Sequence, residues 1–99
     1  MAARAFELHE EAEKELDDAI AVIESARSDW GFRFLAAFDL AIVTIMEYPD
    51  IGRRAGRFRI FTMAEWPYKI VYTLERDLIF ITAVAHHKRK PGYWRKRVH

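Results

Sequence analysis

The sequence predicts an α+β domain in which an N-terminal helical hairpin packs on one face of a small antiparallel sheet, with the element order β-α-α-β-β-β. Two segments of helical periodicity occupy the first half of the chain, and three runs rich in β-branched and aromatic residues occupy most of the second half. The chain has 99 residues, of which 52% are hydrophobic, so it has material for a core and is too apolar for intrinsic disorder. We therefore expect one domain over residues 1–99.

The elements of the first half are bounded by local signals. Residues 4–8 alternate in polarity, which predicts a short edge or pairing strand. Over 10–26, apolar residues recur every three or four positions, and glutamates fill the first turn, where they suit the positive end of the helix dipole. A second amphipathic helix is expected over 30–48, because Pro49 cannot continue it. The stretch 50–56 contains two glycines and predicts a loop.

The second half predicts three strands, at 57–63, 68–74 and 78–86, followed by a basic and aromatic tail at 87–99. The strand 78–86 has almost no residue suited to water, so it should be central and paired on both edges. Five aromatic residues are expected in the core or between the helices and the sheet: Trp30, Phe32, Phe34, Phe38 and Phe61.

Charge is segregated along the chain. Residues 1–52 contain 4 basic and 12 acidic side chains, whereas 53–99 contain 12 basic and 3 acidic ones, so the halves carry −8 and +9. A basic surface of this density suits nucleic acid, an acidic partner protein or an anionic surface. The alternative is that the acidic helix packs near the basic half and neutralises it.

Several classes of protein are excluded or disfavoured. There is no cysteine, which excludes a disulfide scaffold and thiolate metal sites and favours a reducing, cytoplasmic setting. The N-terminus lacks the apolar stretch of a signal peptide, and no apolar run approaches the roughly 20 residues that span a bilayer, so we expect no membrane association. His86 and His87 are adjacent on a strand and point to opposite faces, so they cannot form a metal pair. We expect no metal and no cofactor, and His86 should bond to its surroundings at the strand end.

Three stretches of sequence resemble the RelE/ParE superfamily of toxins from bacterial type II toxin–antitoxin modules, in particular its ParE-like or plasmid-stabilisation branch. The first is the helix start at 11–16. The second is 65–72, where Trp66 replaces the phenylalanine of the family's Phe-Pro-Tyr pattern. The third and most specific is 83–94, with two arginines close behind it. The resemblance extends from about residue 6 to 97.

This resemblance implies a toxin that inhibits growth by binding its target, DNA gyrase, without an active site of its own. It also implies a cognate, ParD-like antitoxin that neutralises the toxin in a hetero-oligomer. Two alternatives stay open. RelE-like members are ribosome-dependent ribonucleases that cleave messenger RNA, and a basic protein of this size could also be a non-toxic nucleic-acid-binding adaptor.

If the protein is a ribonuclease, the resemblance places catalytic roles on three residues. Lys69 stands where the RelE branch usually has an arginine, His87 stands where it has another, and Tyr93 matches its C-terminal tyrosine. An imidazole that is mostly neutral at pH 7 weakens a phosphate clamp, although it can act as an acid or a base. The set is therefore only partly matched.

Contact groups for the target or the antitoxin are expected among the basic residues near the sheet and in the tail. Alternation on the predicted strand places the first two of these arginines on the face opposite Phe58 and Ile60. A large aromatic ring beside Pro91 and Gly92 favours burial, so we expect Trp94 to anchor the tail on the body of the protein. The predicted contact groups are Arg57, Arg59, Arg89, Arg95 and Arg97.

Overall fold

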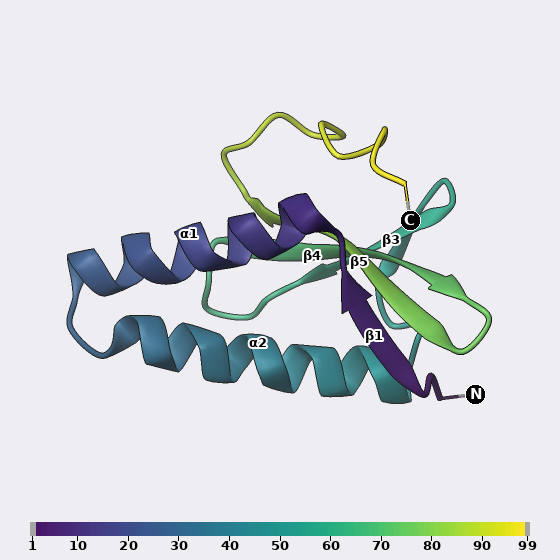
Figure 1. Ribbon diagram of the computed structural model, residues 1–99, viewed down its shortest axis with the longest axis horizontal. Helices are drawn as coiled ribbons and strands as arrows, with labels where there is room; N and C mark the ends of the chain where they lie inside the picture. Colours follow the sequence, from purple (N-terminus) through teal and green to yellow (C-terminus); the bar gives the residue numbers. More distant parts are fainter. Residues whose placement is uncertain (1, 99) are drawn as a thin grey trace.

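The computed structural model describes residues 2–98, and Figure 1 shows two antiparallel helices packed against a twisted sheet. The expected helices and strands are confirmed to within one residue at their ends. In chain order the elements are β1 (Ala5–Leu8), α1 (Glu10–Ala26), α2 (Trp30–Glu47), β2 (Arg53–Ala55), β3 (Phe58–Thr62), β4 (Tyr68–Glu75) and β5 (Leu78–His86).

In the helical hairpin, a side chain accepts hydrogen bonds at the N-terminal end of each helix. His9 caps α1, because its Nδ1 accepts a hydrogen bond from the Glu11 amide at 3.0 Å. At the start of α2, the Glu24 carboxylate accepts from the amides of Asp29 at 3.0 Å and Gly31 at 2.9 Å. A Cβ at Gly31 would lie 3.0 Å from the Ile20 carbonyl, so glycine allows the two helices to approach closely. Neither helix of residues 2–98 is long and apolar enough to span a membrane.

The five strands of residues 2–98 form one sheet in the order β1-β5-β4-β3-β2. Strand β5 pairs with β1 on one edge and with β4 on the other, as its apolar sequence predicts. All neighbouring pairs are antiparallel except β1 and β5, which run parallel with Phe6 opposite Ile79.

Two features of the sheet differ from the prediction. The sheet is mixed rather than purely antiparallel, and β2 is an additional edge strand within the stretch expected to be a loop, with Arg54 opposite Arg59. Both pairings are made by backbone groups. Side-chain alternation shows which residues face the core, but it gives neither the direction of a strand nor the pairing of a short exposed edge.

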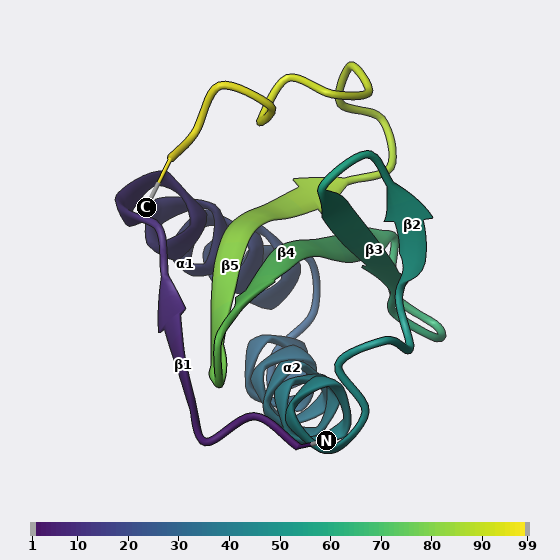
Figure 2. The ribbon, with the colours of Figure 1, turned by 90° about the vertical axis from the view of Figure 1, so that its right-hand side faces the viewer.

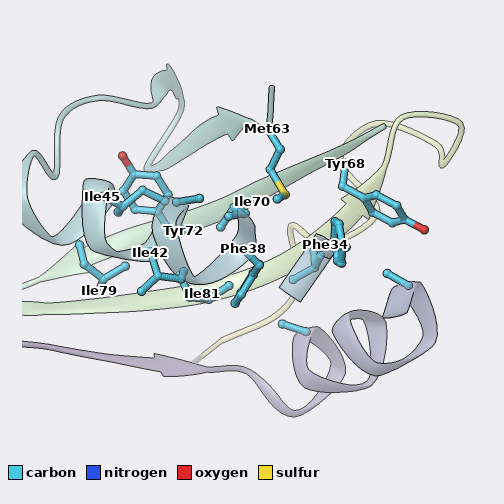
Figure 3. Close-up of a cluster of buried hydrophobic side chains, with 14 residues drawn as sticks. Phe34, Phe38, Ile42, Ile45, Met63, Tyr68, Ile70, Tyr72, Ile79 and Ile81 are labelled. Atoms are coloured by element: carbon cyan, nitrogen blue, oxygen red, sulfur yellow. The ribbon is translucent and has the colours of Figure 1, made fainter. Parts of the chain in front are cut away.

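The main core lies between the helices and one face of the sheet, as the close-up in Figure 3 shows. Residues from α2, including Phe34, Phe38 and Ile42, pack against Ile70 and Tyr72 of β4 and against β5. The Phe34 ring meets the rings of Trp66 and Tyr68 with centroids 5.2 and 5.1 Å apart.

The expectation that Phe32 is buried is wrong. Its side chain is 76% exposed, whereas Phe34 and Phe38 are buried and Trp30 and Phe61 are partly buried. Phe32 precedes Phe34 by two residues and therefore lies about 200° around the helix from it, on the side away from the sheet.

We predict that Tyr72→Phe destabilises the protein by about 1–3 kcal/mol, the cost of leaving buried polar groups unpaired. The buried Tyr72 hydroxyl donates to the Pro49 carbonyl at 2.7 Å and accepts from the Gly52 amide at 3.0 Å, so it holds the chain between α2 and β2. Urea denaturation measures the effect, and Tyr48→Phe, at an exposed tyrosine, is the matched control. Equal midpoints for the two variants would show that other contacts hold this segment.

Candidate interaction surface

The C-terminal segment 87–98 crosses the face of the sheet opposite the helices, as Figure 2 shows. Its central residue, Trp94, is 2% exposed and packs edge-on against Phe58, with ring centroids 4.8 Å apart. The tail therefore covers a second, smaller core. The other buried members of this core are Ile60, Val71, Ala83 and Ala85.

The tail is also tied to helix α1 through Glu15. Arg97 donates to both carboxylate oxygens of Glu15, at 2.9 and 3.0 Å, and the Tyr93 hydroxyl donates to one of them at 2.5 Å. The same carboxylate accepts from the Val84 amide at 3.0 Å, and Arg97 donates to the Thr82 carbonyl at 3.1 Å. These bonds satisfy the edge of β5 beyond Ile81, where its pairing with β1 ends.

The electrostatics of this network follow from its burial. Burial alone would raise the pKa of Glu15, but the hydrogen bonds from Arg97, Tyr93 and the Val84 amide outweigh it and hold this pKa below its usual value. Burial, together with the adjacent Glu15 carboxylate, raises the pKa of Tyr93 far above its usual value. At neutral pH, Glu15 is therefore charged, and Tyr93 keeps its proton and donates it to Glu15.

Two of the arginines predicted to make external contacts are engaged inside the fold. The Arg97 side chain is only 15% exposed, because it bonds to Glu15. Arg59 donates to the carbonyls of Asp50 at 3.2 Å and Gly52 at 2.9 Å and lies 3.4 Å from the Asp50 carboxylate. These interactions place Arg59 and Arg97 among the structural residues rather than on the free surface.

Of the three residues assigned to a ribonuclease site, Tyr93 has its hydroxyl engaged by Glu15. Lys69 lies opposite Ala85, and the His87 amide bonds to the Pro67 carbonyl, so both residues are near the end of the β4–β5 pair. The Tyr93 hydroxyl instead bonds to Glu15 beyond the other edge of β5. Strand β5 thus lies between the backbone of Lys69 and the Tyr93 hydroxyl. A RelE-like site would need this hydroxyl beside the cations.

His86 behaves as expected for a strand-end residue. Its Nδ1 accepts from the Lys88 amide at 3.0 Å, and its ring meets Tyr68 edge-on, 4.9 Å away. Within residues 2–98, no group of three His, Asp or Glu side chains is placed to hold a metal ion.

The remaining predicted contact groups, Arg57, Arg89 and Arg95, are exposed. Each guanidinium lies over an aromatic ring of the tail or of β3: Arg57 over Phe58 at 4.6 Å, Arg89 over Tyr93 at 4.0 Å and Arg95 over Trp94 at 5.0 Å. These cation–π contacts restrict the arginine side chains. Two cations of the tail, Arg89 and Arg95, and one of the β2–β3 turn, Arg57, therefore lie against aromatic rings of the fold.

A second, apolar surface lies along α2 on the other side of the molecule. A groove of about 270 Å³ runs between α2 and the end of β3, lined by Ala37, Ala41, Phe61 and Met63 among others. At its rim, Leu40 is 67% exposed. An exposed leucine beside an apolar groove is the kind of surface that a partner segment covers.

The sequence interpretation missed Glu15, although a signal was present. Glu15 lies within the apolar stripe of α1, next to positions 12, 16 and 19, which face the core. A charge on that face is buried at least in part and therefore requires a partner. The partner itself, Arg97, is 82 residues away and could not be identified from spacing.

The sequence-family model of the ParE toxin of the type II toxin–antitoxin system parDE matches residues 6–91 of this chain. The chain belongs to the ParE toxin family. Protein Y4kP of Sinorhizobium fredii, named as a candidate toxin, is 33% identical over 80 residues, which are 79% of this chain and 83% of that protein. A solved structure of the chromosomal ParDE toxin–antitoxin system from P. aeruginosa shares the fold, with a TM-score of 0.73 at 11% identity over 86% of this chain and 96% of that one.

The protein is thus a ParE-family toxin of a type II toxin–antitoxin system. The family match ends at residue 91, so Trp94 and Arg97 lie beyond it. The contacts that Trp94 and Arg97 make are therefore known from the structure of this chain and not from the family match.

We predict that Trp94→Ala lowers the free energy of unfolding by about 3–5 kcal/mol, the range for removing a large buried aromatic ring. The loss follows from the cavity left beside Phe58 and Val71. Thermal melting measures it, with Phe32→Ala as the control, since an exposed residue should change stability by about 0.5 kcal/mol or less. A Trp94→Ala protein that melts like the parent would mean that the tail does not stabilise the fold.

We also predict that Glu15→Gln destabilises the protein by about 1.5–3 kcal/mol at pH 7, the range for hydrogen bonds to charged groups. Because the folded-state pKa of Glu15 is depressed, its stabilisation is present above the ordinary carboxyl pKa and is lost as pH falls through the folded-state value. The difference between parent and variant should therefore shrink on acidification. Denaturation at several pH values tests this, with the exposed Glu13→Gln as control; a difference independent of pH would contradict it.

Proposed function

We propose that this ParE-family toxin inhibits growth by binding DNA gyrase, and that a cognate antitoxin neutralises it in the cytoplasm. The observation that supports binding over catalysis is the engagement of the Tyr93 hydroxyl by Glu15. A tyrosine that already donates to a buried carboxylate, and whose pKa is raised, is a poor proton-transfer group. The exposed cations of the tail remain available for contact with a target.

The antitoxin is proposed to cover the groove between α2 and β3. The groove and the exposed Leu40 offer apolar contact area, which suits an amphipathic segment with leucine or isoleucine anchors. Acidic residues in the same partner would meet the cations of the tail. A stable complex of this kind is expected to bury about 1,600 Å² in total.

Induced expression tests the mode of action. We expect DNA-damage signalling and gyrase-dependent breaks while bulk messenger RNA stays intact. A gyrase variant selected for resistance should remove both the breaks and the growth arrest. Codon-phased cleavage of messenger RNA would instead favour the RelE-like ribonuclease.

Matched variants sharpen this test. His87→Ala, at an exposed residue, should leave growth inhibition unchanged if the protein acts by binding. Tyr93→Phe removes one hydrogen bond to Glu15, so its toxicity must be compared with its melting temperature. Loss of toxicity in His87→Ala, with normal melting and loss of RNA cleavage, would overturn the proposal. Normal growth on induction of the parent protein would overturn both modes of action.

A further inference from the structure

Three arginines, two from the turn between β2 and β3 and its flank and one from the distant tail, lie around this turn. Arg54 donates through Nε to the Gly56 carbonyl at 3.3 Å. Arg57 is the next residue of the turn, and Nη1 of Arg95 would lie 3.9 Å from a Cβ placed on Gly56. The sequence separates Arg95 from the other two by about 40 positions, and the fold of the tail brings it near Gly56.

The side chains of this arginine cluster are held in place. Arg57 and Arg95 lie over the rings of Phe58 and Trp94, which pack against each other and are both buried. Gly92 has a φ of +81°, and a Cβ there would lie 2.9 Å from Nε of Arg95, so Arg95 passes directly across this glycine. Cations that are already positioned lose less side-chain entropy when they bind a ligand.

The cluster has no counter-ion within the described part of the chain. The ion pairs among residues 2–98 use Arg4, Lys14, Arg59 and Arg97, and none includes a member of the cluster. All three members are exposed. Three arginines around one turn, none of them ion-paired with a carboxylate, favour the binding of an external anion.

The surroundings of the cluster distinguish between two anionic partners. An acidic protein segment is expected to anchor apolar side chains in pockets beside its charged contacts. The aromatic rings under the cluster are covered, since Phe58 is 4% and Trp94 2% exposed, so they offer no apolar surface for such an anchor. A phosphodiester backbone needs no such pocket, since its binding is largely electrostatic, and arginine forks match its oxygens.

We propose that Arg54, Arg57 and Arg95 form a site for the phosphate backbone of duplex DNA. The choice of DNA over RNA rests on the proposed action at gyrase, which works on DNA. The rings of Phe58 and Trp94 are buried and cannot stack on bases, so the site reads no sequence. It adds a DNA contact to the proposed gyrase contact.

Fluorescence anisotropy of the purified full chain with a labelled duplex of about 20 base pairs tests the proposal. Three phosphate contacts predict a slope of about −2.7 for the logarithm of the binding constant against that of the salt concentration, or about 40-fold weaker binding between 50 and 200 mM KCl. The combined Arg54→Ala, Arg57→Ala and Arg95→Ala variant should lose most of this slope and melt like the parent.

The matched control removes the same charge elsewhere. Arg4, Arg27 and Arg33 are exposed in the N-terminal third, and their combined replacement by alanine should leave the slope unchanged. Equal loss in both triple variants would mean that only net charge matters and would overturn the site. Tighter binding of single-stranded RNA, or of a poly-glutamate peptide of equal charge, would overturn the assignment to duplex DNA.

The outcomes separate this inference from the proposed function. Growth arrest with gyrase-dependent breaks, without measurable DNA binding by the toxin, would leave the gyrase proposal standing and overturn the DNA site. Cluster-dependent DNA binding without any effect on gyrase would support the site and overturn the gyrase proposal.

Discussion

Strand β5 imposes the constraint that organises this protein. It is apolar on both faces, and although β4 pairs along the whole of one edge, β1 pairs along only part of the other. Ile79 and Ile81 face the helices, whereas Ala83 and Ala85 face the tail. Each face requires its own cover. Pairing with β1 ends where the chain turns into α1, which exposes the backbone of β5 beyond Ile81. Glu15 and Arg97 occupy that edge and supply the hydrogen bonds that a longer strand would have supplied.

The local elements could be predicted from the sequence, and the long-range ones could not. Helix α1 has the predicted bounds because periodicity and the polar first turn are properties of adjacent residues. The parallel direction of β1 depends on β5, more than 70 residues away, and leaves no mark on either strand. Strand β2 could not be predicted because it is only three residues long, Arg53–Ala55, is flanked by two glycines, and its pairing uses only backbone groups.

The same limit applies to the candidate site. The basic tail and the burial of Trp94 follow from composition and from the Pro-Gly turn beside it. The internal hydrogen bonds of Arg59 and Arg97 do not follow from composition, because a long arginine side chain can reach carbonyls and carboxylates that only the fold brings near. The role proposed for Arg54 could not be predicted either, since it depends on Arg95, which only the fold brings near the same turn.

Charge segregation survives folding in part. Three ion pairs of residues 2–98 join the acidic and basic halves, namely Arg4–Asp77, Asp50–Arg59 and Glu15–Arg97, and only the last has both side chains largely buried. Self-neutralisation is therefore incomplete.

The network at Glu15 also has a consequence for synthesis on the ribosome. Helices α1 and α2 are complete by residue 47, but the strands that cover them come later, and the partner of Glu15 is made near the end of the chain. At about 5–20 residues per second, some 50 residues take roughly 3–10 s to translate. During that interval the apolar face of the nascent hairpin is not yet covered by β3, β4 and β5, and the Glu15 carboxylate has not yet met Arg97. A cotranslational binder of this hairpin would thus meet the chain before it has acquired its basic tail.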